Sequence, residues 1–178
     1  MTTVKISAAH MRQIFHGCEP DYIRDVCHGA CCRSSTEPSG VRIALLPAEV
    51  ERFTGKGLPV VGGYLQPVPG QRRCPHQQAG SNLCGLHDTP DKPFGCIASP
   101  FILTARDTLI VRNRYRLLKC YRDGELPAYR AFAASLVLLF GREEASAITR
   151  HLDSGGGDIS AEMLPSSYAA LEHLQGRP

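Results

Sequence analysis

The chain has 178 residues, of which 43% are hydrophobic and 21% are charged, and its formal net charge is +3. This length and composition predict one globular domain over residues 1–178, since domains commonly run to about 100–200 residues. The small net charge argues against a polybasic protein that binds nucleic acid mainly by neutralising phosphates. No apolar stretch approaches the roughly 20 residues of a membrane-spanning helix, so we expect no membrane partner.

The amino terminus shows no basic region followed by an apolar one, which is the pattern of a secretory signal. We therefore expect a cytoplasmic protein. Stable disulfides are rare in that reducing compartment, where cysteine-rich sequences more often bind metal or do chemistry. The eight cysteines thus predict a metal site, and a disulfide-bonded exported protein is the alternative.

The first half of the chain is predicted to be mostly irregular. Residues 7–16 carry apolar side chains at helical spacing, and residues 41–46 alternate as in a short strand. Pro47 opens a helix that runs to Phe53 and is ended by Gly55 and Gly57. Residues 62–99 form a loop region rich in proline, and a loop of that length inside a compact domain is usually functional or held by other means.

The second half is predicted to be more regular. Residues 108–118 alternate as in a strand, and helices are expected at 127–140, 143–152 and 161–174, with the glycine run 154–157 as a flexible connector. We expect a small α+β protein, with a cysteine-rich metal-binding region of about 18–122, a few strands, and a C-terminal helical layer of about 127–175.

The candidate metal ligands are thiolates, which suit zinc and iron–sulfur clusters far better than magnesium or calcium. Four of them complete a tetrahedral zinc site or a 4Fe–4S cluster. The predicted ligands are Cys27, Cys31, Cys32, Cys74, Cys84, Cys96 and Cys120. The pattern leaves open which four bind.

Cysteine spacing favours an iron–sulfur cluster, with zinc as the alternative. Structural zinc sites usually repeat a short Cys-x2-4-Cys pair, but only Cys27 and Cys31 are so spaced here. Adjacent cysteines point apart in most backbones, so we expect strain if Cys31 and Cys32 bind the same zinc ion. A cluster is larger and accepts ligands from several loops. Three histidines could replace a thiolate, or could be ordinary loop residues: His28, His76 and His87.

A basic face is predicted on the strand at 108–118. Alternation places Arg112, Arg114 and Arg116 on one side, where they could bind an anionic cofactor, substrate or partner. A solvated edge strand guarded by charge is the alternative. Acidic residues such as Glu49 also lie near the cysteines, but no spacing assigns them a role.

From Cys27 onward the chain resembles the family of zinc- or iron-chelating proteins named for a Cys-x2-Cys-x2-Cys-Cys motif. Its opening signature is similar to Cys27-His28-Gly29-Ala30-Cys31-Cys32, and its most diagnostic stretch to Cys84-Gly85-Leu86-His87, Lys92-Pro93-Phe94-Gly95-Cys96 and Pro100-Phe101. Cys74-Pro75-His76 and Cys120 resemble its other cysteine segments. The resemblance covers about residues 18–122.

The resemblance implies a metal centre of unspecified chemistry. A related domain occurs in a flagellin lysine methylase, in which the cysteines are thought to hold an iron–sulfur centre, so an enzyme that modifies protein or nucleic acid is conceivable by analogy. The sequence does not decide whether the chain is an enzyme. A zinc-stabilised binding module for an acidic partner and a metal chaperone or storage protein are the alternatives.

Overall fold

The computed structural model describes residues 2–33 and 43–175. The chain folds into two compact units, each with helices and strands, and the prediction of an α+β fold is confirmed. Unit 1 consists of Met1–Gly17 and Ile97–Pro178, and unit 2 of Cys18–Cys96. The cysteine-rich unit is therefore shorter than the region of 18–122 expected from the sequence.

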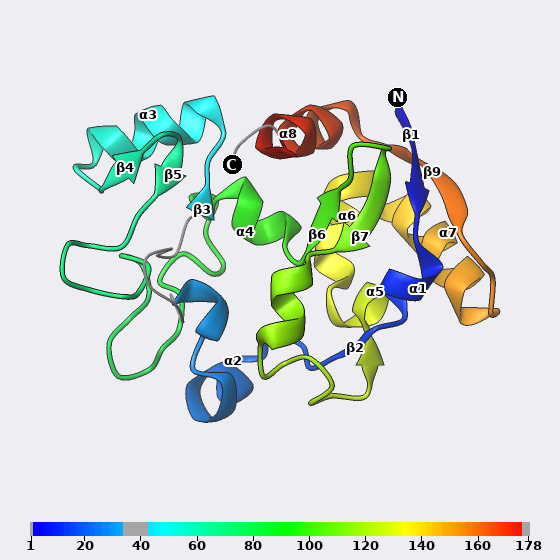
Figure 1. The fold of residues 1–178 in the computed structure, drawn as a ribbon, viewed down its shortest axis with the longest axis horizontal. Helices are drawn as coiled ribbons and strands as arrows, with labels where there is room; N and C mark the ends of the chain where they lie inside the picture. The colour runs from blue at the N-terminus through cyan, green and yellow to red at the C-terminus, as the bar shows by residue number, and fades with distance from the viewer. Residues whose placement is uncertain (1, 34–42, 176–178) are drawn as a thin grey trace. The chain divides into compact units, whose positions relative to one another are not determined.

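Unit 1 is built on a four-stranded sheet with the order β6-β7-β1-β9 (Figure 1). The strands are β1 (Thr2–Ile6), β6 (Phe101–Leu103), β7 (Thr108–Val111) and β9 (Ile159–Met163). β1 pairs in parallel with β7 and antiparallel with β9, whereas β6 and β7 form an antiparallel pair. Among the described residues, β1 thus pairs only with strands that follow unit 2 in the sequence.

Five helices accompany this sheet in the described part of unit 1. They are α1 (Ala8–Met11), α5 (Ala128–Ala131), α6 (Ala133–Phe140), α7 (Arg142–Asp153) and α8 (Pro165–Gln175). α6 and α7 pack against β9, and α8 packs against β6. A two-stranded ribbon joins β2 (Ile14–Phe15) to β8 (Leu126–Pro127), and a 3₁₀ turn, η3, spans Asn113–Leu117. The fully buried large side chains of unit 1 are Ile6, Met11, Phe15, Leu103, Leu109, Leu136, Leu139, Ile148 and Leu152.

Three predicted helices of this unit differ in the structure. The helix expected at 7–16 is the single turn α1, followed by β2. The helix expected at 127–140 is divided into α5 and α6 at Phe132, where φ is −121° and ψ is 39°. The helix expected at 161–174 begins as β9, because its side chains alternate between buried and exposed and its backbone pairs with β1. α7 agrees with its prediction.

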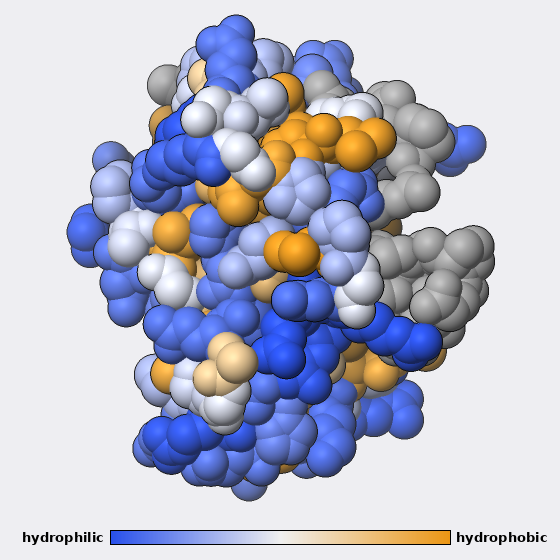
Figure 2. Space-filling model, turned by 90° about the vertical axis from the view of Figure 1, so that its left-hand side faces the viewer, coloured by the Kyte–Doolittle hydropathy of each residue, from blue (hydrophilic) through white to orange (hydrophobic). Residues whose placement is uncertain are grey.

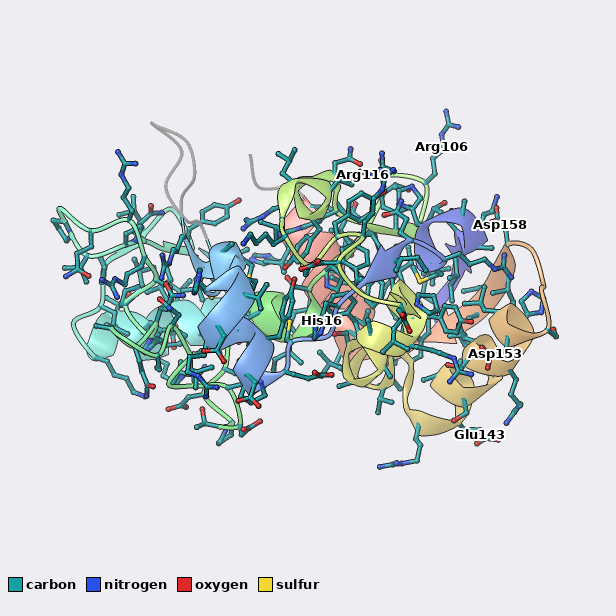
Figure 3. All side chains as sticks on the ribbon, turned by 90° about the horizontal axis from the view of Figure 1, so that it is seen from below. His16, Arg106, Arg116, Glu143, Asp153 and Asp158 are labelled. Carbon is teal, nitrogen blue, oxygen red and sulfur yellow. The ribbon has the colours of Figure 1, made fainter. Side chains whose placement is uncertain are left out.

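The glycine run between α7 and β9 is held in place by side chains from the start of the chain. Nη2 of Arg12 donates to the carbonyl oxygens of Leu152, at 3.0 Å, and Gly156, at 2.6 Å. Asp158 accepts a hydrogen bond from the backbone N–H of Ala8 and forms an ion pair with Lys5. Figure 3 labels Asp153 and Asp158, one at each end of this connection. The run therefore connects α7 to the strand β9 rather than to a second helix, and it is hydrogen-bonded to the start of the chain.

Unit 2 has shorter elements and long irregular segments. Its helices and turns are α2 (Pro20–Tyr22), the π-helical turn η1 (Ile23–Cys27), the 3₁₀ turn η2 (Ala30–Cys32), α3 (Pro47–Gly55) and the first three residues of α4 (Phe94–Ala98). β3 (Ile43–Ala44), β5 (Tyr64–Leu65) and β4 (Val60–Val61) form a small antiparallel sheet in that order. α3 begins at Pro47 as predicted, whereas the strand expected at 41–46 lies partly outside the described residues.

The apolar core of unit 2 is small. It consists of Leu45, Phe53, Leu65 and Cys74, with partly buried side chains around them. Figure 2 views the side of the molecule that carries α3, β4 and β5, where hydrophobic surface is visible among hydrophilic residues. Val61 in β4 is 66% exposed. Unit 2 therefore buries little apolar surface for its length.

Within the described residues, no helix is both long enough and apolar enough to cross a membrane.

Candidate metal centre

The turn η2 brings the sulfurs of Cys31 and Cys32 together. It follows two residues in the left-handed conformation, His28 with φ of 52° and Gly29 with φ of 60°, and the N–H of Cys32 donates to the carbonyl of Gly29 at 2.8 Å. The two Sγ atoms lie 3.9 Å apart. The expectation that these adjacent side chains point apart is therefore wrong, because their sulfur atoms are in contact within this turn.

Cys74 is joined to this turn through the backbone. Its N–H donates to the carbonyl oxygen of Cys32 at 2.9 Å, and its side chain is only 4% exposed within the core of unit 2. Backbone hydrogen bonding by His76 and Gln77 lowers the pKa of Cys74 against the larger effect of burial, and the N–H of Gln77 also donates to the carbonyl oxygen of Cys74 at 3.0 Å. Hydrogen bonds that lower the pKa favour the thiolate over the thiol, so they suit a metal ligand.

Cys84 lies on a loop that folds back beside the segment after Cys74. Residues Gln77 and Cys84 form an antiparallel bridge, and the N–H of Gly85 donates to the carbonyl of His76 at 2.8 Å. The sulfur of Cys84 accepts a hydrogen bond from the N–H of Leu86 at 3.4 Å. Cys84 thus repeats the sulfur environment of Cys74, with a backbone donor two residues further along the chain.

Cys96 is placed by α4, whose start is fixed by a buried carboxylate. Oε1 of Glu49 accepts a hydrogen bond from the N–H of Phe94 at 2.7 Å, and Oε2 accepts one from the N–H of Leu46 at 2.9 Å. Each of these N–H groups lies at the beginning of a helix, where backbone donors lack helical partners. Glu49 therefore ties the start of α3 to the start of the helix that carries Cys96.

A close approach of two backbones also fixes α4. A Cβ atom on Gly95 would lie 2.8 Å from the carbonyl oxygen of Ala44 in β3, which is closer than real side chains come. Only glycine fits here without displacing β3. The residue before Cys96 thus holds α4 directly against the small sheet.

Five thiols of unit 2 influence one another electrostatically. The hydrogen bond with Cys31 and burial raise the pKa of Cys32, and negative charge on Cys31, Cys96 or Cys74 raises it further. Burial raises the pKa of Cys74 to about 11, with contributions from Cys84 and Cys31. Burial is also the largest cause that raises the pKa of Cys96. Negative charge on Cys74, Cys31 or Cys84 raises this pKa further. These sulfurs are therefore close enough for thiolate charges to repel one another.

The chemistry of this donor set fits a thiolate-bound metal. The five sulfurs come from four segments of unit 2, and backbone N–H groups bond the sulfurs of Cys74 and Cys84. Across residues 2–33 and 43–175, however, no group of three or more histidine, cysteine, aspartate or glutamate side chains has the arrangement that could hold a metal ion. The thiols are thus neighbours, without forming a closed coordination sphere.

Two predicted ligands lie outside this group of five. Cys27 ends η1, just before the left-handed residues that lead into η2. Cys120 belongs to unit 1, where its carbonyl oxygen accepts a hydrogen bond from the N–H of His16 at 2.8 Å. Both remain predicted ligands only. Cys18, which was not among the predicted ligands, is exposed.

The three candidate histidines have other contacts. Nδ1 of His28 lies 2.9 Å from a backbone carbonyl oxygen of η1, to which it can donate. The ring of His76 packs against that of Phe53, with 5.6 Å between their centroids. Nδ1 of His87 lies 3.3 Å from Nζ of Lys92. These contacts agree with ordinary loop residues at His28 and His87, whereas Nε2 of His76 is buried and has no hydrogen-bond partner among the described residues.

The basic segment after β7 is a turn, so the prediction of a strand over 108–118 fails beyond β7. Arg112 precedes η3, whose 3₁₀ conformation repeats every three residues, so Arg114 and Leu117 share one side. Tyr115 is buried, while Leu117 is 88% exposed. Arg116, labelled in Figure 3, is exposed on the same turn. The three arginines therefore do not form one face of a strand, because the buried Tyr115 anchors a turn.

Sequence reasoning missed two residues that position the candidate cysteines. Glu49 was left without a role, although a glutamate three residues after the cap position of a helix is a known capping signal. Gln77 carries no such signal, because glutamines are usually exposed, yet it is buried here.

Comparison with protein-family models, with curated proteins and with solved structures gives no match. The resemblance to the cysteine-motif family therefore remains a prediction, carried by the cysteine segments alone.

Proposed function

We propose that unit 2 binds a metal centre through cysteine thiolates, and that this centre is an iron–sulfur cluster of the 4Fe–4S type, with zinc as the alternative. The observation that supports it is the gathering of Cys31, Cys32, Cys74, Cys84 and Cys96, whose charges influence one another. A reducing compartment such as the cytoplasm is part of the proposal, because the ligands must stay reduced.

Electrostatics gives the thiols a reason to bind a cation. Several thiolates close together repel one another, and burial further disfavours each charge. A metal ion or cluster supplies the compensating positive charge and releases the thiol protons on binding. The side chain of Lys92 is a cation that lowers the pKa of Cys96, against the larger effect of burial.

Each of four segments can supply one ligand to a cluster. These ligands would be Cys74, Cys84, Cys96 and one member of the pair Cys31 and Cys32. A bound cluster would supply one-electron redox chemistry, with a potential set partly by hydrogen bonds to its sulfurs. The backbone N–H groups of His76, Gln77 and Leu86 are the donors in place for that purpose.

Zinc is supported by a different observation. Two sulfur ligands of one tetrahedral zinc ion lie about 3.8 Å apart when each Zn–S bond is about 2.3 Å long. The separation of 3.9 Å between the sulfurs of Cys31 and Cys32 is compatible with that geometry. In this case the metal would cross-link the loops of unit 2 and do no redox chemistry.

Anaerobic purification with iron, zinc and sulfide analysis tests the proposal. A cluster should give about four iron and four sulfide per chain, with broad absorption near 400 nm. Cys96→Ser should lose the metal, whereas Cys18→Ser should keep it. A wild-type protein that binds neither iron nor zinc after reconstitution would refute the proposal.

The basic turn η3 suggests a second function, the binding of an acidic partner. Arg114 and Arg116 are exposed on this turn, beside the highly exposed Leu117. Replacement of Arg112, Arg114 and Arg116 by glutamine should then weaken binding to heparin at low salt and leave metal content unchanged. Unchanged heparin binding would exclude this function.

A further inference from the structure

The carboxamide of Gln77 occupies a central position among the cysteine loops. The side chain is only 5% exposed. Its Nε2 lies 3.1 Å from the carbonyl oxygen of His28, 3.3 Å from that of Gly29 and 3.1 Å from that of Asn82. An amide NH₂ group has two protons, so the three carbonyls share them. One side chain thus bonds the turn before Cys31 and the loop before Cys84.

The other end of the same amide is also engaged. Oε1 of Gln77 accepts a hydrogen bond from Nε of Arg33 at 3.3 Å, and Nη2 of Arg33 donates to Oδ1 of Asn82. Arg33 follows Cys32 directly, and its backbone bridges that of Arg73, the residue before Cys74. These side chains thus form a polar joint, which consists of Gln77, Arg33 and Asn82. The joint links the turn of Cys31 and Cys32 to the segments that carry Cys74 and Cys84, and no sulfur takes part in it.

The backbone is shaped to admit this joint. Gly29 has a φ of 60°, and a Cβ atom there would clash with Nε2 of Gln77 and with the carbonyl oxygen of Asn82. A glycine is therefore required both by the left-handed conformation and by the approach of the amide. The close fit places the amide directly against the turn that leads to Cys31 and Cys32.

We propose that Gln77 is a positioning residue of the metal centre, which holds the Cys31–Cys32 turn beside the loops that carry Cys74 and Cys84. This inference rests on the proposed function. Gln77 does not bind the metal. It acts through the two loops that carry the ligands, as outer-shell partners of metal sites do.

The alternative role for a buried glutamine is the filling of space. Gln77→Glu separates the two roles, because glutamate has nearly the same shape and keeps an oxygen for Arg33 but loses both N–H donors. Gln77→Ala removes the whole amide. Gln78→Ala is the matched control, since Gln78 is the exposed neighbour of Gln77.

The metal-loaded protein provides the first measurement, in which each variant competes with a chelator for the metal. Loss of an outer-shell partner typically costs 10–100-fold in metal affinity. We expect a loss of about that size in both Gln77→Ala and Gln77→Glu, with an altered absorption or electron paramagnetic resonance spectrum, and no change in Gln78→Ala. Wild-type affinity in Gln77→Glu would overturn the inference, because it would show that Gln77 only fills space and that its N–H donors are not needed.

Thiol reactivity in the metal-free protein provides the second measurement, which does not depend on the proposed function. We expect iodoacetamide to alkylate Cys31 and Cys84 faster in both Gln77 variants than in the wild type. Unchanged rates would overturn the inference even if the protein binds metal. If wild-type protein binds no metal, the proposed function fails, and faster alkylation would still support the joint between the loops.

Asn82→Gly keeps the test decisive if the Gln77 variants do not fold. Asn82 has a φ of 61°, which glycine adopts without strain, and the change removes only the side-chain acceptor of Arg33. We expect a smaller loss of metal affinity than the 10–100-fold of an amide deletion. Wild-type affinity and wild-type thiol reactivity together in this variant would overturn the role of the joint.

Discussion

The two units of this chain are stabilised by different means. Among the described residues, 25 buried hydrophobic side chains belong to unit 1, but only six belong to unit 2, and Cys74 is one of those six. Unit 1 packs helices against a four-stranded sheet, whereas unit 2 has two-residue strands and long irregular segments. A small unit with so little apolar burial usually needs a further source of stability, such as a metal or disulfides.

The cysteines of unit 2 lie where that further source would act. Cys74 is part of the apolar core, and Cys32 packs against it. Under the proposed function these residues would serve two purposes, because they fill the core and would offer sulfur to a metal. The contrast then predicts that loss of the metal or of core side chains has coupled effects in unit 2 and separate effects in unit 1, which four measurements can test.

Removal of the metal should have the largest effect. Apparent binding free energies of structural zinc are about 10–16 kcal/mol in small metal-dependent folds. We expect chelation of the loaded protein to increase amide hydrogen exchange at Leu45, Phe53 and Leu65 in unit 2, while Ile6 and Ile148 in unit 1 stay protected. Equal loss of protection in both units would contradict the expectation that only unit 2 depends on the metal for its stability.

Matched core deletions should have the next largest effect. Leu139 in unit 1 and Leu65 in unit 2 are both fully buried, and Leu→Ala at such sites costs about 2–5 kcal/mol. Leu139→Ala should lower the unfolding free energy and leave metal content unchanged. Leu65→Ala should lower metal retention as well, because Leu65 shares a core with Cys74. Full metal retention by Leu65→Ala would contradict the shared role of that core.

Loss of the Glu49 carboxylate should have an intermediate effect. Glu49→Ala leaves the N–H groups of Leu46 and Phe94 without their acceptor, and an unsatisfied buried donor costs about 1–3 kcal/mol. We expect thermal unfolding of unit 2 at a lower temperature and faster alkylation of Cys96. Glu51→Ala, on the exposed side of the same helix, is the control and should match the wild type. Slow alkylation in both variants would show that α4 does not depend on Glu49.

Acid should affect unit 1 through Asp158, with the smallest effect. The hydrogen bond from Lys5 and then the N–H of Ala8 hold the pKa of Asp158 below its ordinary value of 3.8. A lowered folded-state pKa gives stability that is present above the ordinary value and is lost as pH falls through the folded-state value. Asp158→Asn should therefore unfold at a lower temperature than the wild type at pH 6, and the difference should shrink as the pH falls below 3.8. A difference that persists in acid would mean that charge is not the cause.

Local signals in the sequence predicted local structure well. Pro47 opens α3 because proline suits the first helical position, and that signal lies within the helix itself. β9 was mistaken for a helix because the partner that makes it a strand, β1, is at the other end of the chain. The turn η3 was mistaken for a strand because alternating arginines imitate a strand face, while the burial of Tyr115 depends on the tertiary fold.

The candidate site shows the same difference between local signals, which the sequence reveals, and contacts between distant segments, which it does not. The spacing of the cysteines onto separate loops led to the expectation that Cys74, Cys84 and Cys96 meet Cys31 or Cys32. The structure makes these thiols electrostatic neighbours, but within the described residues no three of them are arranged to hold a metal ion. Gln77 could not be found in this way. Its partners are backbone carbonyl groups. Every residue has such a group, so the sequence does not mark which of them accept a hydrogen bond from Gln77.

The chain leaves unit 1 after Gly17 and returns to it at Ile97, so unit 2 is a loop between two parts of one sheet. Ala8 and Asp158, which are hydrogen-bonded, are 150 positions apart. Unit 1 can close its sheet only by bringing the ends of that loop together, and the entropy lost in doing so grows with loop length. Each halving of the effective loop length lowers this entropic cost by about 0.6 kcal/mol. An ordered unit 2 shortens the effective loop, so any ligand that orders unit 2 also speeds and stabilises the closing of β1 onto β7 and β9, without touching them.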